Sequence, residues 1–305
     1  MLPHPLVECV PNISEGRDHH KIQALAQIIK QHDGVALLDV DSDADHHRTV
    51  ITFAGTPEAV GEAAFQLVQA AMNQIDLNTH QGVHPRMGAL DVLPFVPLQG
   101  ATLENCVALA NQVGKRIGEN LNIPVFLYEA AAKQPERRNL ANVRKGPFET
   151  FPDKLQTTEW QPDYGPSQLH SSAGAIAVGA RQPLIAFNVN LNTDNLSLAR
   201  HIAKEIRHSS GGFPEVKALG FSLEQRGIVQ VSMNMTNYKV TSLYEVFDRI
   251  STLASEQGIT VTESEIVGLT PRQALLDGEI SSLKLSSFDA AQVLESQIER
   301  AFDHE

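Results

Sequence analysis

The sequence predicts an α/β (α+β) protein that is divided into two subdomains. Two observations carry this prediction. Short runs rich in β-branched residues alternate with amphipathic segments of helical period, and this βαββαβ order occurs twice along the chain. We therefore expect an N-terminal subdomain over residues 1–180 and a C-terminal subdomain over residues 181–305.

The first half contains strand-like and helix-like segments in the order expected. Strands are predicted at Val7–Ile13, Val35–Asp41, Thr49–Gly55, Asp91–Pro97 and Val125–Tyr128. Helices are predicted at His20–Lys30, Pro57–Met72 and Leu103–Gly118. Pro57 suits the first position of its helix behind Thr56, and Thr102 suits the N-cap of the next helix.

The second half repeats the order more clearly. Its predicted strands are Pro183–Leu191, Lys217–Glu224, Ile228–Met235 and Ile259–Val267, and its predicted helices are Asn195–Arg207 and Thr241–Gln257. The short turn at residues 225–227 predicts a hairpin. Each half is expected to form a ferredoxin-like βαββαβ subdomain, with a mixed sheet and helices packed on it.

The segments outside these patterns are less regular. Residues 147–174 are rich in Pro, Gly and Ser and show neither period, which is typical of a functional loop or a linker. The subdomain boundary is expected near residues 175–182. Residues 286–302 are expected to form a C-terminal helix, with apolar positions that suit packing on the body or on a partner subunit.

The composition excludes several classes of protein. Of the 305 residues, 42% are hydrophobic and 20% are charged, which is ordinary for a globular chain. The net charge of −12 argues against a general nucleic-acid binder. Apolar runs are far shorter than the ~20 residues that cross a membrane, and the N-terminus lacks a secretory signal. Two cysteines indicate reduced thiols in a cytoplasmic protein.

Potentially reactive side chains gather in one part of the first half. The segment from Asp41 to Arg48 reads DSDADHHR, and His80, His84, Arg86 and Asp91 follow it. Loops at the ends of strands are the usual place for binding groups in α/β folds. A histidine oriented by a carboxylate suits proton transfer near neutral pH, but these residues equally suit a solvated loop.

Other kinds of chemistry have weaker support. Several of the same acids and histidines are of types that bind zinc, but no ligand motif with a metal-binding spacing occurs. The fragment of alternate acids at residues 41–45 lacks the glycine and glutamate of a calcium loop. No serine-hydrolase elbow, P-loop or dinucleotide fingerprint is present.

Two further segments are candidates for ligand binding. One is the polar stretch Gly165, Pro166, Ser167, Gln168, Leu169, His170, Ser171, Ser172, Ala173 and Gly174, whose composition also suits an interdomain loop. The other is the pair Asn188 and Asn190, which face the same side of a predicted strand. Buried amides need partners, which either a ligand or a neighbouring strand can supply.

Six sequence blocks together resemble the glutamate formiminotransferase family, in collinear order from about residue 6 to residue 280. They are ECVPNISEG (8–16), LLDVDSDADHHRTV (37–50), HQGVHPRMGALDVLPFVPL (80–98), VGARQPLIAFNVNL (178–191), QVSMNMTNYKVT (230–241) and VGLTPRQALLD (267–277). The segment HPRMGALD is the most specific of them. The resemblance implies the stand-alone form, without a cyclodeaminase domain.

The resemblance also implies an activity and a site. Such enzymes transfer the formimino group of N-formimino-L-glutamate to N5 of tetrahydrofolate, their co-substrate, in histidine breakdown. The catalytic histidine of the motif falls on His84, its accompanying aspartate on Asp41, and the folate-binding stretch on residues 165–174. Both substrates carry carboxylates, so Arg48, Arg86 and Arg181 are candidate anchors. The alternative for each arginine is a structural salt bridge.

The sequence departs from the family at one position near the site. The residue before Arg48 is commonly Asn in the family and is His47 here, which leaves the donor open to question. A transferase that uses 5-formyltetrahydrofolate, a folate-binding protein without transferase activity, and a metal-dependent hydrolase are the alternatives. A homodimer is also expected.

Overall fold

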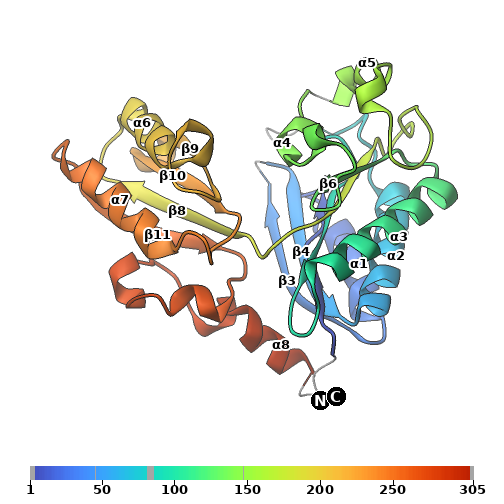
Figure 1. Cartoon of the computed structure of the whole chain (residues 1–305), viewed down its shortest axis with the longest axis horizontal. Coiled ribbons are helices and arrows are strands. Elements are labelled where there is room, and N and C mark those ends of the chain that lie inside the picture. Colours follow the sequence, from blue (N-terminus) through green and yellow to red (C-terminus); the bar gives the residue numbers. More distant parts are fainter. Residues whose placement is uncertain (1–3, 45, 81–85, 147, 303–305) are drawn as a thin grey trace. The chain divides into compact units, whose positions relative to one another are not determined.

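The computed structural model describes residues 4–44, 46–80, 86–146 and 148–302 (Figure 1). The chain divides into two compact units, one of residues 1–181 with 301–305 and the other of residues 182–300. Each unit has its own sheet and its own hydrophobic core. Over the described ranges, no helix combines the length and the apolar character that a membrane crossing requires.

The first unit is built on a seven-stranded mixed sheet. Its strands are β1 (Val7–Cys9), β2 (Asn12–Ile13), β3 (Val35–Asp43), β4 (Arg48–Gly55), β5 (Leu90–Pro97), β6 (Val125–Glu129) and β7 (Ile176–Ala180). Both β1 and β2 pair with β4 on one side and β5 on the other, so they form one interrupted strand. The sequence predicts this strand without the interruption, which falls at Pro11, a residue that has no N–H for a ladder.

Three long helices cover one face of the first sheet. They are α1 (His19–Lys30), α2 (Pro57–Gln74) and α3 (Leu103–Leu121), close to the predicted ranges (Figure 1). Asp18 and Thr56 accept N-terminal backbone hydrogen bonds from α1 and α2, and Thr102 forms a capping box with Asn105 on α3. Buried residues of all three helices join the sheet in one apolar core.

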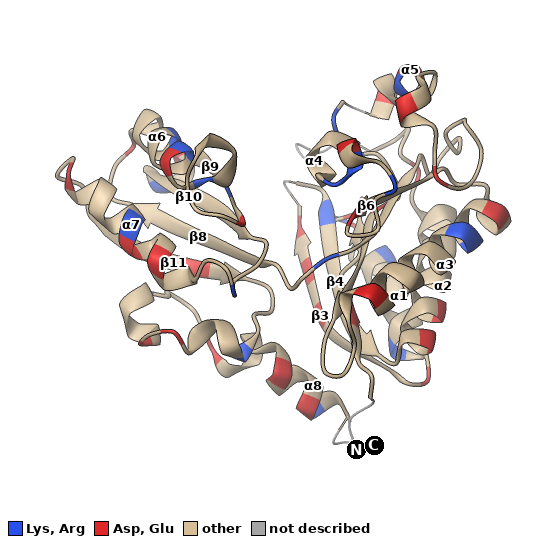
Figure 2. Cartoon of the chain, in the orientation of Figure 1, with Lys and Arg blue, Asp and Glu red and all other residues tan. Residues whose placement is uncertain are grey.

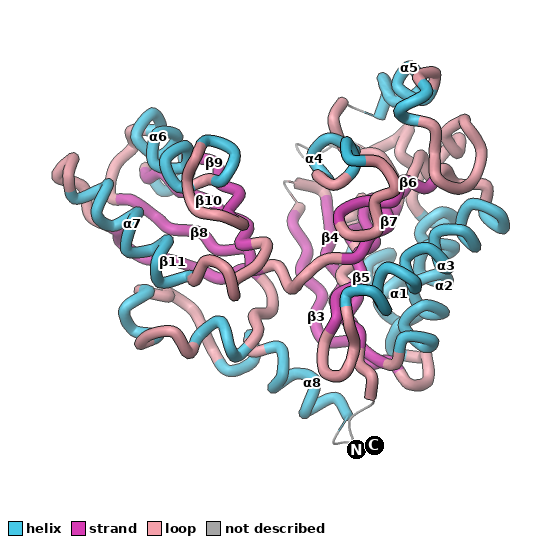
Figure 3. The backbone as a smooth tube through the Cα atoms, viewed as in Figure 1, coloured by secondary structure: helices cyan, strands magenta, loops and turns pink. Residues whose placement is uncertain are grey.

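The strand β7 belongs to the sheet of the first unit, and the chain divides just after it, between Arg181 and Gln182. It lies between β5 and β6 and runs parallel to both, in the interior of the sheet (Figure 3). Side chains along β6 alternate between the two faces, so Val125 and Leu127 join the helix core while Phe126 and Tyr128 join a second core. The short helices α4 (Leu140–Val143) and α5 (Phe151–Leu155) cover this second face.

The second unit is a four-stranded sheet with two helices. Its elements are β8 (Ile185–Leu191), α6 (Leu196–Ile206), β9 (Val216–Leu223), β10 (Ile228–Met235), α7 (Leu243–Ser255) and β11 (Val261–Val267). The order β11-β8-β10-β9 is antiparallel throughout, so the predicted mixed sheet is wrong for this unit. The helix α6 does connect β8 to β9, but β10 lies between them, and no parallel pair is adjacent.

The C-terminal segment packs against the second unit. Ser264 pairs with Leu285, and Thr270 pairs with Val293, through isolated parallel bridges. Leu283 and Val293 belong to the core of this unit. The helix α8 is shorter than the predicted one and spans Leu294–Phe302, because the residues before it are engaged in these bridges and in 3₁₀ turns.

Candidate active site

A buried glutamate begins the site at the turn between β2 and α1. Glu15 is 6% exposed, and its Oε1 accepts hydrogen bonds from the N–H groups of Gly16, Arg17 and Asp18 at 3.0–3.1 Å. The ring Nε2 of His47 lies 2.9 Å from the same oxygen. Burial raises the pKa of Glu15, but the hydrogen bonds from Arg17, Asp18 and His47 outweigh it and lower the pKa to about 2. Glu15 is therefore ionised at neutral pH.

Two histidine rings are stacked beside this carboxylate. The rings of His47 and His80 lie 4.1 Å apart between centroids, with an interplanar angle of 11°. His80 Nε2 donates to the backbone oxygen of His47 at 3.0 Å, since a carbonyl can only accept. Burial lowers the pKa of His80, and the positive groups of His47 and Arg86 add to this effect, whereas the hydrogen bond to His47 opposes it.

The acidic and basic residues of β3 and β4 meet at one end of the first sheet (Figure 2). Asp43 on β3 pairs in register with Arg48 on β4, and Asp41 lies two residues before Asp43 on the same strand. Burial lowers the pKa of Arg48, as does the neighbouring Arg144, while Asp91, Asp43 and Asp41 act in the opposite direction. The structure therefore brings Asp41 and Arg48 together. With Asp43, Asp91 and Arg144 they form a cluster of both signs of charge, here called the charged cluster.

Asp91 organises the described part of the HPRMGALD segment. It is 2% exposed, and its Oδ1 accepts from the N–H groups of Met87 at 2.7 Å and Gly88 at 3.2 Å. Its Oδ2 forms an ion pair with Arg144. The carboxylate therefore fixes the turn that precedes β5, and it carries Arg144 into the neighbourhood of Arg48.

Arg86 lies on the same segment and has its own partners. Its guanidinium contacts Glu149 at 2.9 Å and the backbone oxygen of Leu77 at 3.4 Å, and it lies over the Phe148 ring. The Glu149 contact is exposed and is therefore a weak one. Arg86 is thus held close to the cluster by an exposed carboxylate that a bound anion can replace.

Part of the stretch 165–174 packs against residues that flank the candidate catalytic segment. Leu77 N–H donates to Ser172 O at 2.9 Å, and the Asn78 side chain donates to Ser171 O at 2.9 Å. Gly88 and Gly174 form an isolated bridge. This end of the stretch therefore lies beside the chain on both sides of residues 81–85.

The other end of the stretch has mainly structural contacts. Gly165 has a φ of +83°, and a Cβ there would lie 2.5 Å from Ile123 O, so only glycine fits. The hydroxyl of Ser167 donates to Gln161 Oε1 at 2.6 Å. The ring Nδ1 of His170 accepts from the N–H groups of Ser172 and Ala173 at 3.4 and 3.1 Å, which closes the loop on itself.

The predicted catalytic histidine lies outside the described residues. His84 falls within residues 81–85, so its predicted pairing with Asp41 stays a prediction. Among the residues that the structure does describe, no three His, Cys, Asp or Glu side chains are grouped as metal ligands.

The asparagine pair of the second unit has protein partners. Asn188 donates to Glu265 Oε1 at 2.9 Å and Asn190 donates to Glu263 Oε1 at 3.0 Å, both across to β11. Gln230 on β10 donates to Asn190 Oδ1 at 3.0 Å. The two amides share the sheet face opposite α6 and α7, as predicted, and neighbouring strands satisfy them.

Arg181 and Arg144 both act electrostatically on Tyr128. Arg181 directly follows β7, its backbone N–H donates to Phe95 O at 3.1 Å, and its charge acts on the buried Cys9 and Tyr128. Both cysteines are free thiols, and burial raises the pKa of Cys9 and of Cys106.

The sequence interpretation missed three residues of the candidate site, namely Glu15, Arg144 and Glu149. Glu15 lies in the block ECVPNISEG, which carries part of the family resemblance, so a signal for it was present. Arg144 and Glu149 lie in short irregular segments that pack on the second face of the sheet, and no periodicity marks them.

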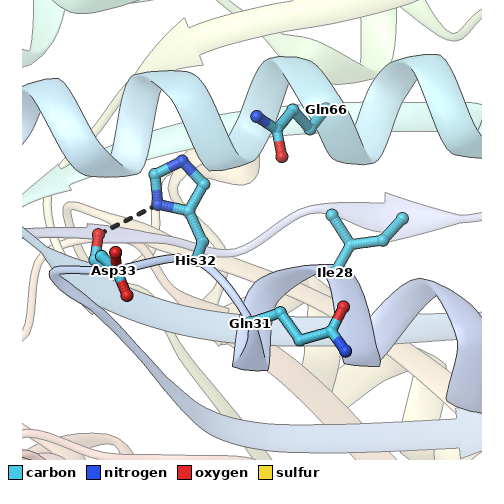
Figure 4. Close-up of a pocket in the computed structure, with 5 residues that line it drawn as sticks. All are labelled: Ile28, Gln31, His32, Asp33 and Gln66. Atoms are coloured by element: carbon cyan, nitrogen blue, oxygen red, sulfur yellow. Dashed lines mark hydrogen bonds between the residues drawn. The ribbon is translucent and has the colours of Figure 1, made fainter.

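A shallow hollow lies elsewhere, between α1 and α2. It has a volume of about 420 Å³ and is lined by Ile28, Gln31, His32, Asp33 and Gln66 (Figure 4). The His32 ring donates from Nδ1 to the backbone oxygen of Asp33 at 3.0 Å. Its lining holds one histidine and one carboxylate, and it is not part of the charged cluster.

Comparison with known proteins assigns the class of protein. The N-terminal subdomain of the formiminotransferase domain matches residues 6–181, and the formiminotransferase domain matches residues 186–296. The chain belongs to the formiminotransferase family.

Individual relatives match most of the chain. The glutamate formimidoyltransferase of Streptococcus pyogenes is 50% identical over 96% of this chain and 98% of its own length. That of Thermoplasma acidophilum is 46% identical, over 98% of this chain and 99% of its own. The mouse formimidoyltransferase-cyclodeaminase is 44% identical over 89% of this chain and 51% of its own length.

Proposed function

We propose that this protein is a glutamate formimidoyltransferase, which transfers the formimino group of N-formimino-L-glutamate to N5 of tetrahydrofolate in histidine degradation. The observation that carries the proposal is the 50% identity to a glutamate formimidoyltransferase over 96% of the chain. Tetrahydrofolate is the acceptor and is consumed as a co-substrate.

The reaction needs a group that moves one proton between two nitrogens. N5 of the folate attacks the amidine carbon and forms a C–N bond, which gives a tetrahedral intermediate. The proton of N5 is removed, the bond from the carbon to the glutamate nitrogen breaks, and that nitrogen receives a proton. We assign both transfers to His84, acting first as base and then as acid, with Asp41 orienting it.

The described residues support an anionic substrate at this place. Arg48 directly follows His47, the charge of Arg86 acts on His80, and Arg144 adds a third guanidinium close to Arg48. The structure gives Arg86 an exposed carboxylate partner, Glu149, that a substrate carboxylate can displace. We keep Arg48 and Arg86 as carboxylate anchors, and we add residues 165–174 as the folate-binding stretch.

The remaining candidates for substrate binding have less support from the structure. Arg181, Asn188 and Asn190 already have protein partners, and a ligand would have to replace or join them. We propose them as substrate contacts only in this sense.

Three further features belong to the proposal. Each unit is proposed to be a ferredoxin-like subdomain: the second has the strand order β11-β8-β10-β9, and the first contains the equivalent order β3-β4-β1/β2-β5, extended by β7 and β6. The homodimer and the cytoplasmic location stay predictions.

Substitution of His84 tests the proposed function directly. The variant His84→Ala should lose about 10²- to 10⁴-fold in kcat, because general acid–base catalysis typically contributes that much. The control is His32→Ala, a histidine of the remote hollow on α1 and α2. Circular dichroism must show both variants folded. A His84→Ala enzyme that transfers the formimino group at the wild-type rate would remove His84 from the mechanism.

A further inference from the structure

We propose that Glu15, His47 and His80 form a positioning cluster, which fixes the chain that leads into the HPRMGALD segment and so sets the rate of group transfer. The inference rests on the proposed transferase function and deepens it. The three residues are positioning residues: they act through the backbone that they hold, and the proposal requires no contact between them and the reacting atoms.

The cluster is anchored by Glu15. Its Oε1 accepts from three consecutive backbone N–H groups and from the His47 ring, so four donors fix one oxygen. Its Oε2 lies 3.7 Å from Lys21 Nζ. Because α1 begins directly after this turn, the carboxylate is attached to a rigid element.

His47 connects this anchor to the next segment. Its φ is +51°, in the left-handed region that a non-glycine residue seldom adopts. Such a conformation persists when the surroundings determine it. Here the contact with Glu15 fixes one edge of the ring, and the stack on His80 fixes its face.

His80 carries the constraint to the chain. Its ring is held by the stack and by the hydrogen bond to the His47 carbonyl. Its backbone N–H donates to Leu77 O at 3.3 Å, and Leu77 N–H donates to Ser172 O at 2.9 Å. Residues 77–80 are therefore tied both to the turn that precedes β4 and to the stretch 165–174.

The chain after residues 81–85 has a separate support. Asp91 holds the N–H groups of Met87 and Gly88, and Ala89 N–H donates to Ala173 O at 3.0 Å. These contacts do not involve the positioning cluster. A change in that cluster should therefore alter the geometry of residues 77–80 and leave the contacts of residues 87–89 in place.

The His80 ring has a chemical feature that a packing role does not need. Its Nε2 carries the hydrogen that the His47 carbonyl accepts, while its buried Nδ1 has no hydrogen-bond partner among the residues that the structure describes. A purely apolar aromatic residue would stack on His47 without leaving an unsatisfied nitrogen. The hydrogen bond to the His47 backbone is therefore the property that distinguishes histidine at this position.

Two substitutions of His80 separate the hydrogen bond from the mere presence of a polar residue. In His80→Gln the amide nitrogen reaches the position of the ring Nε2, so the donor to His47 O is kept. In His80→Asn the side chain is shorter and the donor is lost. The matched control is His32→Gln, because the His32 ring also donates to one backbone carbonyl, again at 3.0 Å, in the remote hollow of Figure 4.

The expected result is a loss in kcat with little change in KM. We expect His80→Asn to lower kcat about 10- to 100-fold, the size of effect that a 1 Å misplacement produces, and His80→Gln to recover most of that loss. His32→Gln should match the wild type. Unchanged kcat in a folded His80→Asn variant would overturn the proposal. A rise in KM at unchanged kcat would also overturn the proposal, because it indicates that His80 binds the substrate directly.

A second variant covers the case in which His80→Asn does not fold. Glu15→Gln keeps the shape and the accepting Oε1 but removes the charge that holds the His47 ring. Glu15→Gln should also lower kcat, by a smaller factor than His80→Asn does. Wild-type kinetics in Glu15→Gln would contradict the positioning role.

Hydrogen exchange keeps this inference separate from the proposed function. The amides of Leu77 and His80 should exchange faster in His80→Asn than in His80→Gln or the wild type, whatever reaction the protein catalyses. Equal exchange in all three proteins would overturn the positioning role. Absence of formimino transfer by the wild type would overturn only the proposed function.

Discussion

Arg137 is the largest side chain that the first unit buries completely, and it shows what one residue contributes to the fold. Its guanidinium pairs with Asp163 at 2.7 Å and donates to the backbone oxygens of Glu159 and Gln161 at 2.7 and 2.5 Å. It also lies over the rings of Phe126 and Trp160. It therefore ties the irregular chain at residues 159–163 to β6.

Removing this guanidinium should be strongly destabilising. We expect Arg137→Met to lower the free energy of unfolding by about 3–5 kcal/mol, because it leaves a buried carboxylate without its partner. Urea denaturation measures the change. The control is Arg272→Met, whose ion pair with Glu299 is half exposed and should cost no more than about 1 kcal/mol. Equal losses in the two variants would contradict the buried-pair interpretation.

Glu15 predicts how stability depends on acidity. Its folded-state pKa of about 2 lies below the ordinary value of 4.5. The ionised carboxylate therefore stabilises the fold fully above pH 4.5, and this contribution is lost as the pH falls towards 2. Between these values the wild type should lose more stability than Glu15→Gln, which urea unfolding at a series of pH values measures. Parallel curves for the two proteins would show that Glu15 is not held as an ionised acceptor.

At the scale of elements, the long amphipathic helices were predictable, because their periodicity and their caps agree. The strand β7 was not. Its sequence, Ile-Ala-Val-Gly-Ala, is short and rich in small residues, and it stands at the expected boundary. Gly179 occurs there because a Cβ would lie 2.6 Å from the ring of Tyr128 on β6. Such a close approach exists only in the assembled sheet, so no local pattern indicates it.

The same limit applies to the candidate site. The chemical types at Asp41, Arg48 and Arg86 were evident from the sequence. The contact of Glu15 with His47 was not, because it joins residues 32 apart along the chain and depends on the pairing of β2 with β4. Sequence patterns reveal which groups are present, whereas strand register decides which of them meet.

Gly88 tests the close approach between the HPRMGALD segment and the loop that precedes β7. A Cβ at this position would lie 2.0 Å from the backbone oxygen of Ala175. We expect Gly88→Ala to cost at least about 2 kcal/mol in unfolding free energy and to reduce activity, because backbone must move. The control Gly258→Ala meets nothing within 4 Å and has a φ of +69°, so it should cost only about 1 kcal/mol. A smaller loss at Gly88 than at Gly258 would be incompatible with this packing.

At the scale of the whole molecule, two units with separate cores each match their own part of one family. The candidate catalytic, anchoring and positioning residues of the charged cluster belong to the first unit. The second unit offers the network around Asn188 and Asn190. Because both units carry candidate residues, the proposed transfer reaction should be measured on the full chain.

The measurement that tests the central claim most directly is the transfer itself. The full-length protein is incubated with N-formimino-L-glutamate and tetrahydrofolate, the mixture is acidified, and 5,10-methenyltetrahydrofolate is detected by its absorbance. The proposed function predicts that this product accumulates with time and with protein concentration, and that His84→Ala forms almost none. No product from the wild-type protein and formiminoglutamate would contradict the account.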